Sequence, residues 1–410
     1  MESHFTSEFF AGNRARLKGL FTGTAPIVIT ANGLLQRGAD GAYGFAQDAS
    51  FWYLTGIDEP DVLLVMDRDK EYLIAPELSD YQKAFDGAES HALLARRAGI
   101  AKIYDGKEGW QQLAGRIKKV KHVATLAPPP ARLEQYGLYV NPARASLVAK
   151  LKSYNAELQL LDLAPHLSRL RMIKQPAELR AIQAAIDITA ASLKDAFRPS
   201  KLKKYATEYQ LEAEIAYGFR KRGAAGHAFA PIVAGGKRAC TLHNVANNAP
   251  LRADELVVAD VGAEVEHYAA DITRTISLSA ASRRQQTVYK AVLEAQDYAM
   301  GLLKPGVRLR EYEHQVELFL GEKLRELGLI KTIDHQKVRH YCPHATSHFL
   351  GLNVHDVGDY DRPLEAGTVL TVEPGIYIPE EAIGVRIEDD VLITDTGVKN
   401  LSRRLPRELG

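Results

Sequence analysis

The sequence predicts a two-domain protein in which an N-terminal α/β domain precedes an α+β domain made of two similar halves. Three observations support this fold class. The chain has 410 residues, which is more than one ordinary hydrophobic core accommodates. Strand-like apolar runs alternate with helical stretches up to about residue 165. Beyond that point, the order helix, helix, strands occurs twice.

Composition narrows the possible functions. Hydrophobic residues make up 46% of the chain and charged residues 25%, as in soluble globular proteins. The net charge of +1 gives no electrostatic case for binding nucleic acid or an anionic membrane surface. No run of ~18 apolar residues and no apolar signal core are present, so no membrane span is expected. Cys240 and Cys342 are far apart, which favours a reducing, cytoplasmic location over a disulfide or zinc-thiolate scaffold.

The N-terminal domain is expected to span residues 1–167 and to contain an open mixed sheet. Apolar runs separated by helical stretches are typical of this architecture. The expected elements are a helix at residues 7–20, strands at 26–31, 63–66 and 71–76, and further strand-like runs at 102–104 and 120–126.

Three consecutive aromatic residues, Phe51, Trp52 and Tyr53, stand out within this domain. Three neighbours of this size are not expected to face one core together. We therefore expect at least one of them on a surface that a domain or subunit interface covers.

The second domain is expected to span residues 168–410 and to begin with helices. Pro176 and Glu178 suit the first turn of a helix, and Leu179, Ile182 and Ile186 follow at helical spacing. A second helix is expected to end at residue 223, a glycine. Residues 285–303 and 310–328 form the matching helix pair of the second half.

Each half ends in a predicted strand pair that carries two acidic residues. In the first half these are Asp260 and Asp271, eleven positions apart in apolar or neutral surroundings. A carboxylate in such a run is unfavourable unless a cation or hydrogen-bond donors receive it. A hairpin would bring the two together around a metal ion. On this stretch alone, two aspartates that cap turns are an equally good interpretation.

The second strand pair carries Glu373 and Glu388, both within β-branched runs. A salt bridge between Arg386 and Glu388 is the ordinary explanation for such a buried glutamate. One arginine cannot neutralise four carboxylates, however, and these would repel each other strongly at low dielectric. Divalent cations could neutralise them.

A fifth ligand is expected from the histidines between the two acidic pairs. Three histidines lie within twelve positions, namely His344, His348 and His355. One histidine alone is more often structural, whereas a cluster favours a site. Carboxylate-rich ligation with one imidazole suits Mn(II), with Co(II), Fe(II), Mg(II) or Zn(II) as alternatives.

Four segments of the second domain together carry a resemblance to a known family. They are DVGAEVEHYAADITRT, HATSHFLGLNVHDVG, VLTVEPGIYI and GVRIEDDVLIT. These segments resemble the metal-site motifs of the pita-bread metallopeptidases, in the branch of aminopeptidase P and prolidase. The resemblance runs from about residue 170 to the C-terminus, and FWYLTGIDEP resembles the creatinase-like N-terminal domain of that branch. It implies a pita-bread catalytic domain with pseudo-twofold halves.

The resemblance also implies a site for two divalent metal ions. Asp260 would chelate one metal, and Asp271 and Glu388 would bridge the two. His348 and Glu373 would complete the shell of the other metal. Glu373 would act as the general base as well.

Five further residues take roles from the same resemblance. His355 would stabilise the oxyanion, and His243 would lie near the scissile nitrogen. His344, Tyr377 and Arg386 would line or brace a pocket for proline. The implied activity is that of an Xaa-Pro aminopeptidase, which removes one residue from peptides with proline at the second position. A homodimer or homotetramer is implied as well.

Two alternatives remain open at the level of sequence. A prolidase, restricted to Xaa-Pro dipeptides, would share every metal ligand. A catalytically silent binding protein is the alternative outside enzymes. The chain also has Phe229 and Asn244 at positions where this branch commonly has tyrosine, and Ala345 where it has glycine. Phe229 cannot donate the hydroxyl hydrogen bond that supports a metal-binding aspartate.

Overall fold

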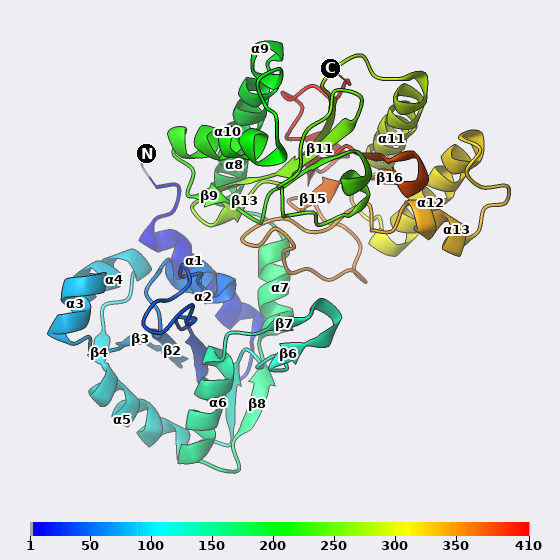
Figure 1. The fold of residues 1–410 in the computed structure, drawn as a ribbon. Helices are drawn as coiled ribbons and strands as arrows, with labels where there is room; N and C mark the ends of the chain where they lie inside the picture. The colour runs from blue at the N-terminus through cyan, green and yellow to red at the C-terminus, as the bar shows by residue number, and fades with distance from the viewer. Residues whose placement is uncertain (1–2, 88, 410) are drawn as a thin grey trace. The chain divides into compact units, whose positions relative to one another are not determined.

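The chain divides into two compact units in a computed structural model that describes residues 3–87 and 89–409. The N-terminal unit is Phe5–Leu170, and the C-terminal unit is Met1–His4 together with Arg171–Gly410. In Figure 1 the N-terminal unit runs from blue to teal and most of the C-terminal unit from green to red.

The N-terminal unit is built on a six-stranded mixed sheet with strand order β4-β3-β2-β1-β5-β8. The β1-β2 and β2-β3 pairs are antiparallel, and the other three pairs are parallel. Its strands are β1 (Ile27–Thr30), β2 (Leu63–Asp67), β3 (Lys70–Ala75), β4 (Ile103–Asp105), β5 (His122–Thr125), β8 (Gln159–Asp162) and the separate pair β6 (Arg132–Leu133) and β7 (Leu138–Tyr139). Its helices are α1 (Ser7–Leu20), α2 (Ala49–Thr55), α3 (Asp80–Asp86), α4 (His91–Ala98), α5 (Gly106–Ile117), η1 (Glu134–Tyr136), α6 (Ala143–Tyr154) and α7 (Ala164–Met172), which continues into the C-terminal unit.

None of the three consecutive aromatic residues is exposed to solvent in the chain. Phe51, Trp52 and Tyr53 form part of α2 and are at most 5% exposed. A helix directs successive side chains about 100° apart, so the three rings point in different directions within one core. The rings of Phe5 and Phe10 pack edge-to-face on Trp52, at centroid distances of 5.3 and 5.4 Å. Phe5 and Phe10 therefore help to bury Trp52.

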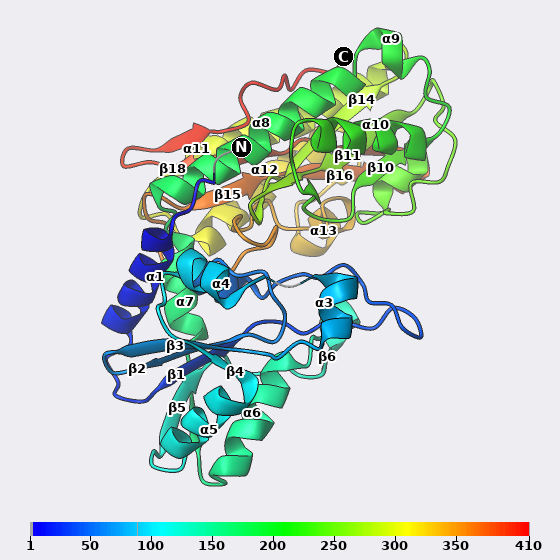
Figure 2. The same cartoon turned by 90° about the vertical axis from the view of Figure 1, so that its left-hand side faces the viewer.

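The first half of the C-terminal unit places two helices over short antiparallel strands. Helices α8 and α10 pack against each other, and α8 also contacts β12 and β13. Figure 2 shows α8 running along the strands. The elements are α8 (Pro176–Ala196), α9 (Pro199–Leu202), α10 (Glu208–Lys221), β9 (Gly226–His227), β10 (Ile232–Gly235), η2 (Gly236–Cys240), β11 (Leu256–Val261), β12 (Ala263–Val265), β13 (Tyr268–Ala269) and β14 (Ile272–Ser277). The sheets are β10-β11-β14 and β13-β12-β9.

The second half repeats this organisation. Helices α11 and α12 pack against each other, and α11 contacts β15, β16 and β17. The elements are α11 (Arg283–Leu302), α12 (Leu309–Glu326), α13 (His335–Tyr341), β15 (Val369–Val372), β16 (Gly375–Ile378), η3 (Pro379–Glu381), β17 (Ile383–Arg386), β18 (Asp389–Ile393) and β19 (Val398–Asn400). The sheets are β15-β18-β19 and β16-β17. The predicted order of an α/β domain and a two-half α+β domain is confirmed.

The long strands expected from the sequence are each broken in two. Between β11 and β12 lies Gly262, where a Cβ atom would approach the carbonyl oxygen of Ala270 to 1.7 Å. Only glycine fits such a close approach of two backbone segments. In the second half, Pro374 follows Glu373 at the break between β15 and β16 and has no N–H to continue a ladder. These breaks fall beside the acidic residues.

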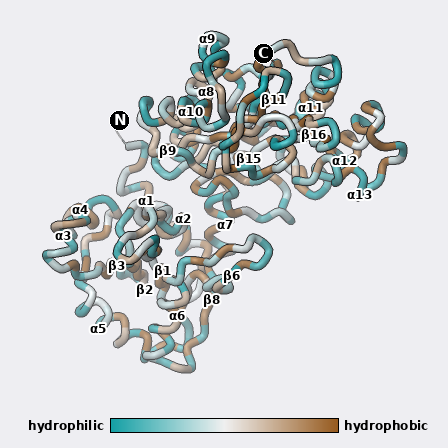
Figure 3. The backbone as a smooth tube through the Cα atoms, in the orientation of Figure 1, coloured by the Kyte–Doolittle hydropathy of each residue, from teal (hydrophilic) through white to brown (hydrophobic). Residues whose placement is uncertain are grey.

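The helices carry both hydrophilic and hydrophobic residues along their length, as the alternating colours in Figure 3 show. Within residues 3–87 and 89–409, no helix is long and apolar enough to span a membrane.

Candidate metal centre

Asp260 and Asp271 lie on the same face of the β11-β14 ladder. Asp260 pairs with Thr273, and the last pair of the ladder is Val261 with Ile272. Asp271 therefore lies one position beyond that pair and two positions from the partner of Asp260. Side chains two positions apart on a strand point to the same face. The hairpin expected from the sequence thus brings the two carboxylates together as diagonal neighbours.

Glu373 and Glu388 face each other at the end of a second ladder. The last pair between β15 and β18 is Val372 with Asp389, so the two glutamates occupy the next opposed positions. The main-chain N–H of Glu388 donates to the carbonyl oxygen of Thr273, at 3.1 Å. This bond connects the strand pairs of the two halves and places all four carboxylates at one junction.

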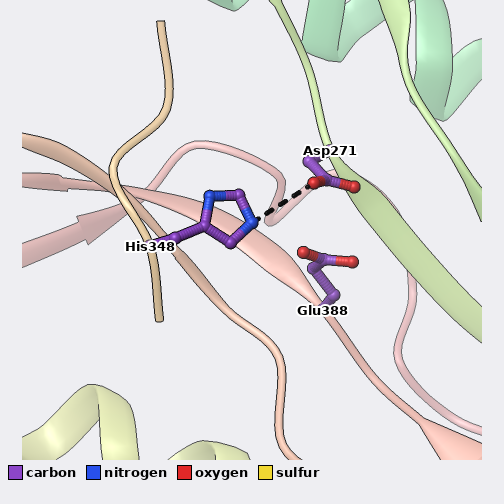
Figure 4. Close-up of side chains that lie close together, drawn as sticks. All are labelled: Asp271, His348 and Glu388. Atoms are coloured by element: carbon purple, nitrogen blue, oxygen red, sulfur yellow. Dashed lines mark ion pairs between the residues drawn. The ribbon is translucent and has the colours of Figure 1, made fainter. Parts of the chain in front are cut away.

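His348 reaches the same junction from the irregular segment between α13 and β15. Its Nε2 lies 3.2 Å from Oε1 of Glu373 and 3.5 Å from Oδ2 of Asp271. Potential ligand atoms of Asp271, His348 and Glu388 all lie within 4.8 Å of one another. Figure 4 shows the imidazole and the two carboxylates turned toward a common point.

The bonding of the buried carboxylates fits a divalent cation. One oxygen of Asp260 accepts a hydrogen bond from Arg386, and one oxygen of Glu388 accepts a hydrogen bond from Thr273, both at 2.6 Å. Asp260 Oδ1 and Glu388 Oε1 are buried and have no hydrogen-bond partner within the described part of the chain. Buried unpaired carboxylate oxygens are unfavourable unless a cation binds them.

The pKa values show that this cluster holds excess negative charge. Burial, together with the charge of Asp260, raises the pKa of Asp271 to about 7. Burial, together with the charges of Asp271 and Glu373, raises the pKa of Glu388 well above its usual value. For Glu373, burial acts in the raising direction, but the hydrogen bond and charge of His348 outweigh it and lower the pKa to about 2. Carboxylates in such a group repel each other's ionisation, which a bound cation would reverse.

Asp271 and Glu373 favour the protonated form of His348. Burial acts to lower the pKa of this imidazole, but hydrogen bonds to Asp271 and Glu373 raise it well above the usual value. A histidine must be neutral to bind a metal ion. The same two carboxylates therefore attract either a proton or a cation to this side of the site.

Arg386 braces the site through a chain of hydrogen bonds. Its guanidinium donates to Asp260 and, at 2.7 Å, to the phenol oxygen of Tyr377. That oxygen is also 2.8 Å from Nε2 of His344. The arginine forms its ion pair with Asp260, whereas the sequence suggested Glu388 as its partner. The chain thus links a candidate ligand to a candidate substrate-binding histidine.

The expected site residues, apart from Tyr377, surround one cavity of about 720 Å³. All five expected ligands line it, together with His243, His344, His355 and Arg386. The His355 ring lies beside the His348 ring, tilted by 46°, at a centroid distance of 4.1 Å. Tyr377 lies behind His344 and is 2% exposed. Phe229, Leu242, Val245 and Val354 give the cavity an apolar part.

Several residues that support the site were not expected from the sequence. Asp356, next to His355, is buried in an ion pair with Arg171 and another with Lys174. Asp390 accepts the main-chain N–H of Asp271, at 3.1 Å. Asp390 lies two positions after Glu388, and this short spacing could have indicated its supporting role. The Asp356 cluster joins positions some 180 residues apart, which spacing along the sequence cannot indicate.

Comparison with known proteins identifies the class. Residues 180–395 match Metallopeptidase family M24, and residues 10–124 match the Aminopeptidase P, N-terminal domain. The chain belongs to metallopeptidase family M24.

Similar proteins within this family carry more specific names. An Xaa-Pro aminopeptidase of Haemophilus influenzae is 35% identical over 399 residues, covering 91% of this chain and 89% of the relative. The Xaa-Pro aminopeptidase of Escherichia coli K12 is 31% identical, covering 96% and 94%. Among solved structures, proline aminopeptidase P II from Yersinia pestis is 30% identical with a TM-score of 0.86, covering 98% of both chains. Zn-substituted E. coli aminopeptidase P in complex with product is 29% identical with a TM-score of 0.86, covering 98% of this chain and 96% of that chain.

Proposed function

We propose that this protein is a metal-dependent Xaa-Pro aminopeptidase, which hydrolyses the N-terminal Xaa-Pro bond of peptides. One observation carries the proposal: four carboxylates and an imidazole from both halves line the same cavity as His243, His344 and His355. The names of the relatives support the same activity.

The metal ligands in this proposal are Asp260, Asp271, His348, Glu373 and Glu388. Asp271 and Glu388 would be shared by two ions, and their ligand atoms lie within 4.8 Å of one another and of His348. Two bound divalent ions would polarise the scissile carbonyl and lower the pKa of water. Mn(II) is the preferred ion because the donor set is oxygen-rich with one imidazole.

The remaining steps fall to side chains of the chain itself. Glu373 would accept a proton as the general base. His355 lines the cavity and would donate to the developing oxyanion. His243, on the loop after η2, lies near the scissile nitrogen in this assignment.

Selection of proline is assigned to the side of the cavity that His344 lines. An Xaa-Pro bond has no N–H, so this pocket must recognise the pyrrolidine ring by shape. The hydroxyl of Tyr377 accepts a hydrogen bond from Arg386 and donates one to Nε2 of His344, which fixes the imidazole for that contact. Residues held by such bonds give the pocket a defined width.

The length of the peptide distinguishes this proposal from a prolidase. The test is to compare hydrolysis of Ala-Pro with that of Ala-Pro-Ala in the presence of Mn(II). We expect cleavage of the tripeptide with release of alanine. Activity confined to the dipeptide would establish the prolidase alternative.

A silent binding protein is the second alternative. It predicts no stoichiometric metal in the purified protein and no activation by Mn(II) after chelation. Metal analysis and a reactivation assay distinguish it from the proposed enzyme. The buried oxygens of Asp260 and Glu388 that lack a hydrogen-bond partner within the described residues support the enzyme, because a cation would bind them.

We also propose that the protein is a cytoplasmic homodimer or homotetramer. The two cysteines, Cys240 and Cys342, are unpaired, which is typical of a reducing compartment. On the N-terminal unit, Tyr81, Phe85 and Tyr139 are 69%, 71% and 81% exposed. Exposed large apolar side chains often mark contacts with another subunit.

A further inference from the structure

The segment at residues 344–348 carries two site histidines but belongs to no regular strand. One edge of it is bonded to β15 and the residues beside it. The carbonyl oxygen of His348 accepts the N–H of Thr371 at 3.0 Å, and that of Thr346 accepts the N–H of Glu373 at 2.8 Å. The backbone of this segment is therefore fixed on its carbonyl side by the strand that leads to Glu373.

A side chain, not a strand, binds the N–H groups of Thr346 and Ser347. Glu313 of α12 accepts the N–H of Thr346 with both carboxylate oxygens, at 3.0 and 2.9 Å. It also accepts the N–H of Ser347, at 3.0 Å. Thr346 and Ser347 are 4% and 3% exposed, so these N–H groups depend on the protein for an acceptor. Tyr312, the preceding residue, places its hydroxyl 2.9 Å from Oγ of Ser347.

We propose that Glu313 is a positioning residue that sets the geometry of the metal centre through the N–H groups of Thr346 and Ser347. Its carboxylate supplies the acceptors that a neighbouring strand would supply, immediately before His348. This inference deepens the proposed function and rests on the assignment of His348 as a metal ligand. Because His344 begins the same segment, Glu313 also fixes the entrance to the proline pocket.

The chemistry of the carboxylate makes the proposal specific. A glutamine would keep the length of the side chain but offer one acceptor oxygen, and its amide N–H groups cannot accept from Thr346 or Ser347. An aspartate would keep both oxygens but is one methylene shorter. Glu313→Gln should therefore loosen the segment, and Glu313→Asp should do so in part.

The direct test is metal affinity, measured by isothermal titration of Mn(II) into metal-free protein. We expect Glu313→Gln to weaken binding by about 10–100-fold, as is typical for residues that orient a metal ligand. Glu313→Asp should lie between this variant and the unaltered protein. Glu322→Gln is the matched control, because Glu322 lies on the same helix in an exposed pair with Arg325. It should bind Mn(II) like the unaltered protein.

Two further readouts separate positioning from a general loss of structure. The visible absorption spectrum of the Co(II)-loaded protein should change in Glu313→Gln and not in Glu322→Gln. Turnover of Ala-Pro-Ala at saturating Mn(II) should show a higher KM in Glu313→Gln, because His344 is displaced. Circular dichroism would show whether each variant keeps its fold, and Glu313→Asp provides the comparison if Glu313→Gln does not.

The result that overturns the inference is unchanged Mn(II) affinity and an unchanged Co(II) spectrum in both Glu313 variants. A failure of the proposed function looks different. In that case the unaltered protein would hydrolyse no Xaa-Pro peptide, while Glu313→Gln would still bind Mn(II) more weakly than Glu322→Gln.

Discussion

The two aspartates of the first strand pair differ in how their carboxylates are held. Asp260 gives one oxygen to Arg386, whereas Asp271 lies beside His348 and forms a ligand group with it and Glu388. Replacing a residue outside the coordination shell lowers metal affinity by up to about 100-fold. We expect Asp271→Asn, which replaces a ligand, to lower metal affinity further. Asp260→Asn should retain more metal. Metal content after dialysis measures both, and equal losses would contradict the shared position of Asp271.

Phe229 lines the same cavity as Asp260, whose Oδ1 is buried without a hydrogen-bond partner within the described residues. Phe229→Tyr adds a hydroxyl that can donate to this oxygen. A hydrogen bond to a charged group contributes about 1.5 kcal/mol or more, so we expect metal affinity to rise about tenfold. Calorimetric titration with Mn(II) measures the change. Unaltered affinity would show that the new hydroxyl bonds elsewhere.

At the level of elements, the start of the C-terminal unit is tied to the loop that carries His355. Asp356 binds both Arg171 and Lys174, and all three side chains are at most 3% exposed. Burial acts to raise the pKa of Asp356, but the charges of Arg171 and Lys174 outweigh it and lower the pKa. The ion pairs thus keep this carboxylate charged inside the protein.

Asp356→Asn would leave two buried cations without their counter-charge. Removing one partner of a buried ion pair destabilises by about 3–5 kcal/mol. At ~2–4 °C per kcal/mol, we expect the melting temperature of the C-terminal unit to fall by roughly 6–20 °C in calorimetry. The exposed Asp359→Asn is the control and should change little. A small effect of Asp356→Asn would mean that Arg171 and Lys174 find other acceptors.

His227 on β9 should make stability depend on pH. Burial lowers the pKa of this histidine to about 4, and its ring packs against Phe219 at 4.9 Å. Between pH 6.5 and 4 the unfolded chain binds a proton at His227 that the folded protein does not bind. Stability therefore falls as the pH drops through this window.

His227→Gln removes this proton uptake. We expect the acid-induced loss of stability between pH 6.5 and 4 to shrink by about 1–2 kcal/mol, after allowance for partial exposure of the ring. Melting temperatures at a series of pH values give the measurement, with the exposed His314→Gln as control. Identical pH profiles for the two variants would rule out His227 as the source.

Helices could be predicted from the sequence where a local signal, such as a proline in the first turn, sets their ends. Helix α8 begins at Pro176, as expected, and α1 matches residues 7–20. The strand breaks at Gly262 and Pro374 were not expected, because the approach of the Ala270 carbonyl is a tertiary contact. The acidic pairs could be found from the sequence because carboxylates are unfavourable within apolar strands. The role of Glu313 could not be predicted in this way, since a glutamate on an amphipathic helix suits an exposed face equally well.

At the scale of the whole molecule, the two-domain order followed from the change in periodicity near residue 165. Phe5 and Phe10, which pack on Trp52, are distant from it in the sequence, so this contact could not be predicted from the aromatic run alone. The proposed oligomer is supported by the exposed side chains of Tyr81, Phe85 and Tyr139.

Light scattering tests that assembly. We expect a mass of two or four chains of 45.2 kDa. Substituting Tyr81 and Phe85 by serine should shift the mass toward one chain if α3 takes part in the contact. A monomer at working concentration would refute the assembly.

Gly262 has a consequence for how relatives of this protein are judged. Its missing side chain leaves room for the Ala270 carbonyl, and so for the approach of Asp260 to Asp271. A homologue could retain all five ligands and carry alanine at this position. A survey that counts ligands would score it as an active enzyme, although its two aspartates could not meet. Activity in genome-scale inventories should therefore be inferred from this glycine as well as from the residues that bind metal.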